Sequence, residues 1–146
     1  MSALELYDES DVKVDLNLAE GEKTRVLLFF ATWCPHCQEE LPRIIEFYTK
    51  LQASAYQDNV ELVVVRTAIS RESFSFPDFK KIFSIPFSVL TDKGLEFESF
   101  AKEQKMRVSY PKLTVVNQQG EVVYHIPPSK YGDTSKELFW LLDTLH

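Results

Sequence analysis

The two cysteines of this chain, Cys34 and Cys37, stand two residues apart in the stretch Trp33-Cys34-Pro35-His36-Cys37. Two thiols at this spacing can form and break a disulfide, because one thiolate attacks a partner sulfur and the other closes the ring and releases the partner. The stretch follows an apolar run and precedes an apolar pattern of helical spacing. A redox site at a strand-to-helix junction is therefore the leading interpretation.

The positions of the two thiols predict different roles. Cys34 comes at the end of the strand, so we expect it to be the exposed nucleophile, and Cys37 in the first helical turn to be the shielded resolving thiol. Pro35 suits the first turn of a helix, where its missing N–H would have had no partner. The helix N-terminus presents partial positive charge to the Cys34 sulfur and favours its thiolate. His36 adds to this effect as a cation or as a hydrogen-bond donor.

The elements around the cysteines predict an α/β protein with a mixed sheet. Strands alternate with helices, and a closing hairpin adds an antiparallel pair. Non-alternating apolar runs favour central strands that are covered on both faces. The expected elements are strands at 4–7, 12–16, 25–31, 60–67, 87–90, 113–117 and 121–126, a turn at 92–94, and helices at 35–54 (with Pro42 inside), from Pro77, at 95–105 and at 134–145.

Apolar spacing also predicts which faces of the later helices are buried. The expected inward residues are Phe79, Ile82 and Phe83, then Phe97, Phe100 and Ala101, and finally Leu138, Leu141, Leu142 and Leu145.

Length and composition favour one globular domain, residues 1–146, and we expect a monomer. The chain has 146 residues, of which 45% are hydrophobic, and a formal net charge of −6. Acidic and basic residues are interspersed, so no basic stripe is available to neutralise phosphates, and nucleic acid is not an expected partner. No apolar run reaches the roughly 20 residues that a transmembrane helix needs.

The residues and their order resemble the thioredoxin superfamily. The shared features are a strand, Trp-Cys-x-x-Cys, a helix with an internal proline, a strand, a helix, and an X-Pro before a hairpin and a final helix. Glu40 and Pro42, three and five residues after the second cysteine, are similar to the motif of the TlpA/ResA-like bacterial thiol-disulfide oxidoreductases. The likeness runs from about Val12 to His146. It implies a thioredoxin fold with a central mixed sheet flanked by helices, an N-terminal β extension and a central inserted strand and helix.

The resemblance implies roles for residues outside the cysteine pair. Tyr110–Pro111 is expected to be a cis peptide bond that faces the two cysteines, with the backbone of Tyr110 available to a substrate strand; an ordinary trans proline is the alternative. Trp33 is expected on the docking surface, or else is a packed aromatic residue. Glu40 either assists deprotonation of Cys37 or is an exposed helical glutamate.

Three positions depart from the family pattern. Leu28 stands where relatives usually have Asp or Asn, six residues before the first cysteine. Without a polar residue there, we expect the reactivity of the two thiols to depend on the helix start, His36 and Glu40. The dipeptide Pro35-His36 resembles that of strongly oxidising DsbA-like proteins. Lys112 follows the proline where Thr is common, and we expect it to be solvated rather than to act on the nucleophile.

The predicted function is thiol-disulfide exchange. Protein thiols or disulfides are the expected substrates, a redox partner protein recycles the site, and no cofactor is expected beyond the Cys34–Cys37 disulfide. The family likeness favours a reductase and His36 favours a more oxidising couple, so the direction of electron flow stays open, with the higher potential as a hypothesis.

Two alternatives come from other classes of protein. Two thiolates and His36 could bind zinc or copper, but a fourth ligand and a second CxxC are missing, so no metal is expected. A thioredoxin-fold adaptor with a merely structural disulfide is the other alternative. The first residues lack the pattern of a signal peptide, yet removal of a leader would leave the same start. We expect a bacterial extracytoplasmic protein, with the cytoplasm as the alternative.

Overall fold

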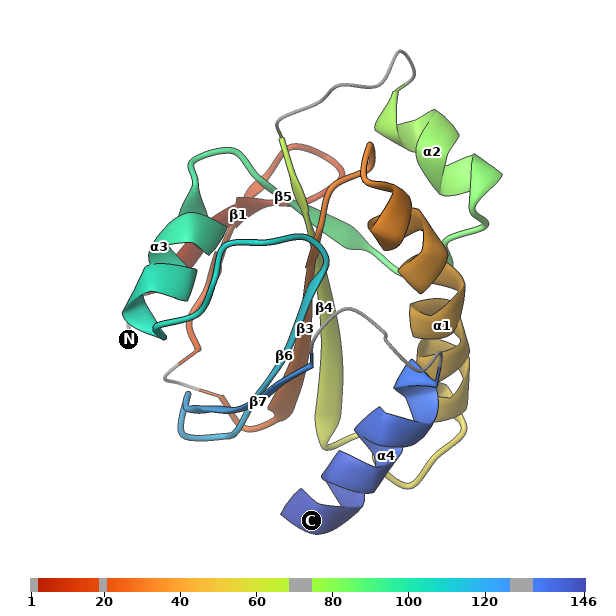
Figure 1. Cartoon of the computed structure of the whole chain (residues 1–146), viewed down its shortest axis with the longest axis vertical. Helices are drawn as coiled ribbons and strands as arrows, with labels where there is room; N and C mark the ends of the chain where they lie inside the picture. Colours follow the sequence, from red (N-terminus) through yellow and green to blue (C-terminus); the bar gives the residue numbers. More distant parts are fainter. Residues whose placement is uncertain (1–2, 19–20, 69–74, 127–132) are drawn as a thin grey trace.

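The computed structural model describes residues 3–18, 21–68, 75–126 and 133–146 (Figure 1). The expected elements are all present, with bounds that differ by a few residues. In chain order they are β1 (Leu4–Tyr7), β2 (Lys13–Leu16), β3 (Thr24–Phe30), α1 (Pro35–Gln52), β4 (Val60–Thr67), α2 (Phe76–Ile82), β5 (Val89–Asp92), α3 (Glu96–Glu103), β6 (Lys112–Val116), β7 (Val122–Ile126) and α4 (Thr134–Leu145).

The strands form one seven-stranded sheet in the order β2-β1-β5-β4-β3-β6-β7. β3 and β5 pair with β4 in parallel, and the other pairs are antiparallel. The predicted mixed sheet is therefore confirmed. The N-terminal hairpin, β1 and β2, extends the sheet beyond β5, as expected for an N-terminal β extension.

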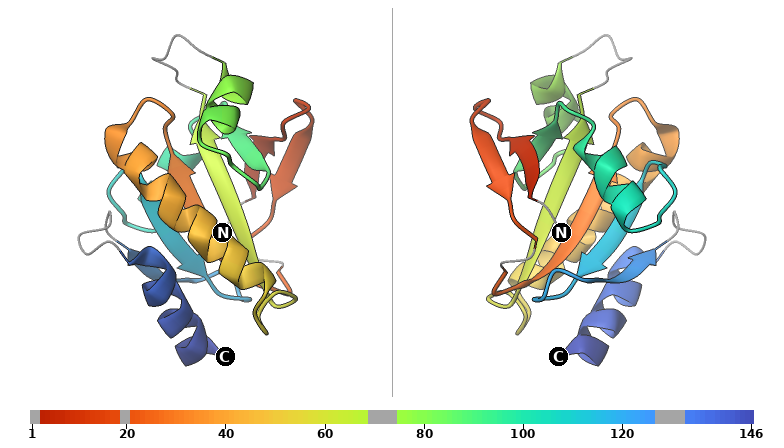
Figure 2. Two further views of the ribbon diagram at one scale, coloured as in Figure 1. Left: turned by 90° about the vertical axis from the view of Figure 1, so that its right-hand side faces the viewer. Right: turned by 90° about the vertical axis from the view of Figure 1, so that its left-hand side faces the viewer.

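Helices cover both faces of the sheet, with α1 and α4 on one face and α3 on the other (Figures 1 and 2). Because successive side chains of a strand point to opposite faces, β3 contributes Leu28 and Phe30 to the core under α1 and α4, and Leu27 and Phe29 to the core under α3. The Phe29 ring stacks on Phe97 of α3, with the ring centroids 4.4 Å apart. This burial on both faces explains the uninterrupted apolar run of β3.

Two predicted inward residues lie at the surface. Ile82 is 67% exposed, because the buried stripe of α2 runs through Phe76, Phe79 and Phe83, and Ile82 lies to one side of it at 100° per residue. Leu145 is also exposed, since the last turn of α4 projects past the end of the sheet (Figure 1). Within the described ranges, no helix combines the length and the apolar character needed to cross a membrane.

The turn that ends α3 contains a lysine in the left-handed backbone conformation. Lys105 has a φ of 56°, its N–H donates to the carbonyl of Lys102 at 3.1 Å, and the N–H of Met106 donates to that of Ala101 at 2.7 Å. This is a Schellman motif with lysine at the position that favours glycine.

Lys105→Gly is expected to raise the free energy of unfolding by about 0.5–1 kcal/mol. Glycine removes the left-handed strain, and the more flexible unfolded chain offsets part of that gain. Urea unfolding measures the change. Gln104→Gly is the control, because Gln104 has a φ of −88° and its replacement should destabilise. A Lys105→Gly protein less stable than wild type would contradict this reading of the turn.

Candidate active site

The two cysteines lie where β3 passes into α1. Cys34 is the N-cap residue of this 18-residue helix, with extended backbone angles (φ −90°, ψ 121°). Its N–H donates to the Ala31 carbonyl at 3.2 Å, and its carbonyl accepts from the Gln38 N–H at 3.0 Å. The Gln38 side chain donates to the Thr32 carbonyl at 2.9 Å, which ties the turn to the helix. The Cys34 sulfur therefore lies at the positive end of α1.

The two thiols differ in accessibility. Cys34 is 8% exposed and Cys37 is 1% exposed. The prediction of an exposed Cys34 is wrong, because its sulfur is turned towards the loop before Pro111 and lies 3.7 Å from the carbonyl oxygen of Tyr110. Cys34 is nonetheless the more accessible thiol, since it caps the helix while Cys37 faces the core.

The surroundings of Cys37 disfavour its thiolate. Burial raises the pKa of Cys37, and the neighbouring Cys34 and the charge of Glu40 raise it further. The Ala31 N–H, 3.5 Å from the Cys37 sulfur, opposes these effects by donating to it. Formation of the Cys37 thiolate consequently calls for a proton acceptor close to the thiol.

The loop before β6 supplies the opposite wall of the site. The Tyr110–Pro111 peptide bond is cis, as the family likeness implies, and Pro111 is buried. β6 pairs with β3 so that Leu113 lies opposite Leu28, which brings Pro111 to the end of the sheet where Cys34 lies. The backbone carbonyl of Tyr110 therefore faces the Cys34 sulfur.

The side chain of Tyr110 is anchored on the other face of the sheet. Its ring lies 5.2 Å, centroid to centroid, from the Phe97 ring of α3. Burial raises the pKa of Tyr110, and a hydrogen bond with Thr67 at the end of β4 partly opposes this. α3 and β4 thus fix the residue whose carbonyl faces the Cys34 sulfur.

A buried carboxylate comes from α1 and not from β3. Leu28 is buried in the same core as both cysteines. Glu40 is buried too, so the alternative of an exposed glutamate is wrong. It lies three residues after Cys37 and shares the inward face of α1. One carboxylate oxygen accepts from the Thr134 hydroxyl, and the other accepts from the Arg43 guanidinium at 3.2 Å.

The remaining predicted residues surround the cysteine pair. Pro35 occupies the first turn of α1. His36 is exposed, and its Nδ1 lies 3.8 Å from a carboxylate oxygen of Glu39. Trp33 is partly buried and packs against the core that contains both cysteines.

Lys112 is only 7% exposed, so the prediction of a solvated lysine is wrong. Alternation along β6 puts it on the face of Val116, under α3, while Leu113 faces the cysteines. Burial, and to a lesser degree the charge of Arg107, lowers the pKa of Lys112.

Sequence reasoning missed the role of Asp92, which it placed in a turn. Asp92 is the last residue of β5 and is buried. Its carboxylate accepts from the N–H groups of Gly94 at 3.2 Å, Glu96 at 2.9 Å and Phe97 at 2.9 Å. It therefore caps α3, the helix that anchors Tyr110. The signal was an aspartate shortly before a helical apolar pattern.

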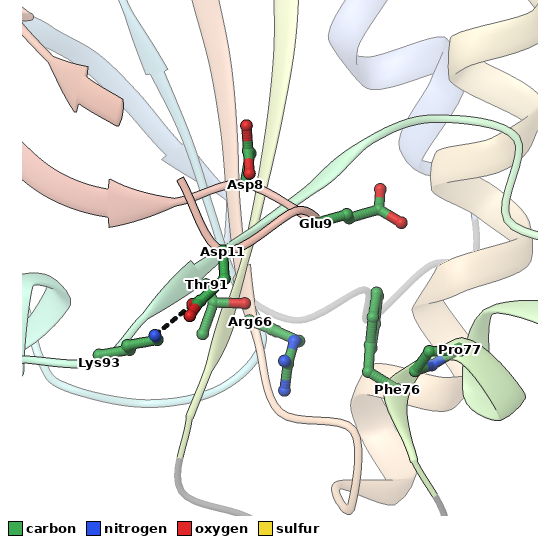
Figure 3. Close-up of a pocket in the computed structure, with 8 residues that line it drawn as sticks. All are labelled: Asp8, Glu9, Asp11, Arg66, Phe76, Pro77, Thr91 and Lys93. Carbon is green, nitrogen blue, oxygen red and sulfur yellow. Dashed lines mark hydrogen bonds and ion pairs between the residues drawn. The ribbon is translucent and has the colours of Figure 1, made fainter. Parts of the chain in front are cut away.

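A cavity of about 190 Å³ lies between the N-terminal hairpin and the start of α2 (Figure 3). In its walls Lys93 pairs with Asp11, and the Arg66 guanidinium lies 4.5 Å from the centre of the Phe76 ring. It contains neither cysteine and is separate from the candidate active site. Across the part of the chain that the structure describes, no three His, Cys, Asp or Glu residues gather into a possible metal site.

Known proteins resemble this chain in sequence. The family described as thioredoxin-like matches residues 21–122. Sporulation thiol-disulfide oxidoreductase A of Bacillus subtilis is 31% identical over 104 residues, which cover 70% of this chain and 58% of that protein. Thiol-disulfide oxidoreductase ResA of Halalkalibacterium halodurans is 25% identical over 118 residues, covering 81% and 61%. The chain thus spans about three fifths of the length of these relatives.

Solved structures resemble it in fold. The crystal structure of StoA from Bacillus subtilis superposes with a TM-score of 0.70 at 22% identity, covering 94% of this chain and 96% of that one. The solution structure of a thiol:disulfide interchange protein from Bacteroides sp. gives 0.72 at 17% identity, covering 97% and 84%. The predicted thioredoxin-like fold is therefore confirmed.

When both thiols are reduced, the native protein is expected to be alkylated quickly by one molecule of iodoacetamide near neutral pH. Since burial raises the pKa of Cys37, its thiolate fraction falls below that of a free cysteine, and its burial excludes the reagent. Mass spectrometry should count one adduct, on Cys34, before unfolding and two after it. Two adducts formed at equal rates in the native protein would contradict this difference between the thiols.

Proposed function

The chain belongs to the thioredoxin-like family, and from that premise we propose that it exchanges disulfides with protein partners through Cys34 and Cys37. One observation supports this most. The Cys34 sulfur lies at the positive end of α1, 3.7 Å from the carbonyl before a cis proline, with a second, buried thiol one turn behind it. No cofactor takes part beyond the disulfide that the two cysteines form.

The exchange proceeds in two steps. In the reducing direction the Cys34 thiolate attacks a sulfur of the partner disulfide, so that a mixed disulfide forms and the other partner sulfur leaves as a thiolate and takes up a proton. Cys37 then loses its proton, and its thiolate attacks the Cys34 sulfur. The Cys34–Cys37 bond forms, the mixed disulfide breaks, and two electrons have passed to the partner. The same steps in reverse oxidise a dithiol partner, and the partner's potential sets the direction.

The partner's reacting segment is placed against Trp33 and Tyr110, which flank Cys34. The Tyr110 backbone is available to a strand of the partner, as in β-strand addition. His36 supplies positive charge when protonated, although water screens it and the Glu39 carboxylate opposes it. A second redox protein recycles the site. We also propose that the protein acts outside the cytoplasm, where disulfides persist. The support for this location is the likeness of its sequence to the ResA-type motif.

Cys37→Ala is expected to accumulate mixed disulfides on Cys34 when the reduced protein meets a disulfide-bonded substrate such as insulin. The attack still occurs, but no second thiol releases the partner. Non-reducing electrophoresis and mass spectrometry detect the adduct. Cys34→Ala is the matched control and should form none. If the two variants formed mixed disulfides to the same extent, the assignment of nucleophile and resolving thiol would be wrong.

Glu40 is proposed as the proton acceptor for Cys37. It lies three residues after Cys37 on the inward face of α1, and its negative charge raises the pKa of the Cys37 thiol. Thr134 and Arg43 each use one lone pair of the carboxylate. A carboxylate has about four such sites, so further ones remain for a proton or a water.

Glu40→Gln separates two effects of this carboxylate. Loss of a proton acceptor should slow release of the mixed disulfide by roughly 100-fold and leave its formation unchanged. Loss of charge alone would lower the pKa of Cys37 and speed release. Rapid-quench kinetics of both steps measure the outcome, with the exposed Glu46→Gln on the same helix as control. Faster release in Glu40→Gln would rule out the proton-acceptor role.

A further inference from the structure

A second cavity, of about 170 Å³, lies on the α3 side of the sheet and shares one residue, Tyr110, with the candidate active site. Tyr110 forms one wall, and its backbone carbonyl faces the Cys34 sulfur at 3.7 Å. The ends of β4 and β5 and the start of α3 form the others. These walls include Thr67, Asp92, Leu95, Glu98 and Val108. A partner polypeptide that pairs with the Tyr110 backbone while it reacts at Cys34 would therefore lie beside a residue of the cavity wall.

The charged groups of the cavity walls are already paired. The Lys93 ammonium pairs with Asp11 outside the cavity, and Glu98 pairs with Lys102 at 3.7 Å. The Asp92 carboxylate accepts from three backbone N–H groups. A charged occupant would lose its hydration here without gaining an unpaired counter-charge. The electrostatics therefore favour an uncharged occupant.

Apolar side chains are exposed at the same place. Leu95 is 56% exposed and Val108 is 45% exposed, and both line the cavity. Leu95 has a φ of 61°, a left-handed conformation that a bulky residue rarely adopts. This backbone holds a leucine side chain at the cavity wall, where glycine would satisfy the turn better. Leu95 therefore presents an exposed apolar side chain although its backbone conformation is unfavourable for leucine.

We propose that this cavity is a specificity pocket that receives an uncharged apolar side chain, of leucine or phenylalanine size, from the partner polypeptide close to its reacting cysteine. The proposal rests on the proposed thiol-disulfide exchange and adds a preference to it. A cavity of about 150 Å³ holds a benzene molecule, so this one has room for such a side chain. Burying that side chain gives the partner affinity that a small disulfide lacks.

The test uses the reduced full chain and short alanine-flanked peptides whose single cysteine carries thionitrobenzoate as a disulfide. Phe, Leu, Lys or Glu replaces alanine at each of the two positions on either side of the cysteine. Glutathione disulfide, which has no side chain to fill the cavity, gives the reference rate. At one position Phe or Leu should raise kcat/KM over alanine by about tenfold or more, and Lys and Glu should not.

Two variants locate the preference. Leu95→Gly removes the apolar wall in a backbone suited to glycine, so the ratio of the Phe-peptide rate to the Ala-peptide rate should fall to about twofold or less, with no loss of thermal stability. Val108→Trp fills the cavity and should lower the same ratio. Lys105→Gly is the matched control: it relieves the same backbone strain, does not line the cavity and should keep the full preference.

The possible failures are distinguishable. Exchange with glutathione disulfide but no preference among the peptides, or a preference for Lys or Glu, would overturn the pocket and leave the proposed function standing. A Leu95→Gly protein that keeps the preference, or that loses peptide and glutathione exchange in equal proportion, would also overturn the pocket. No exchange with any of these disulfides would overturn the proposed function, and the pocket with it.

Discussion

The pairing of β3 with both of its neighbours is the constraint on which the site depends. β3 runs parallel to β4 and antiparallel to β6, so it is hydrogen-bonded along both edges. Its end fixes the position of Cys34, and the start of β6 fixes that of Pro111. A slip of one residue would move the cis peptide by about 3.3 Å and would turn the core side chains of β3 to the wrong face. The distance between the Cys34 sulfur and the Tyr110 carbonyl is thus set by sheet register.

The two faces of the sheet serve the site in different ways. The face under α1 and α4 contains the thiols and Glu40, which take part in the proposed chemistry. The face under α3 anchors Tyr110 through Phe97 and Thr67, and α3 is in turn capped by Asp92. β5 and α3 therefore support the wall opposite Cys34.

The elements and the cysteine pair could be predicted from sequence because their signals are local. Apolar periodicity, the CxxC spacing and the proline before the hairpin each extend over a few residues, and the structure confirms the elements that they predict. The errors arise where burial depends on distant segments. Lys112 is buried on the α3 face of the sheet, and Cys34 is covered because the Tyr110 loop lies against it. Local spacing contains no information about either contact.

The position of the buried carboxylate has a consequence for the resolving step. With Leu28 on β3, the surroundings of Cys37 are apolar, and this burial is the main reason for its raised pKa. Glu40 instead lies on the same helix as Cys37, three residues after it. Its hydrogen bond to Thr134, the first residue of α4, fixes the carboxylate from outside α1. The packing of α4 against α1 therefore determines where the proposed proton acceptor lies, and a change at the start of α4 would act on Cys37, the proposed resolving thiol, without touching either cysteine.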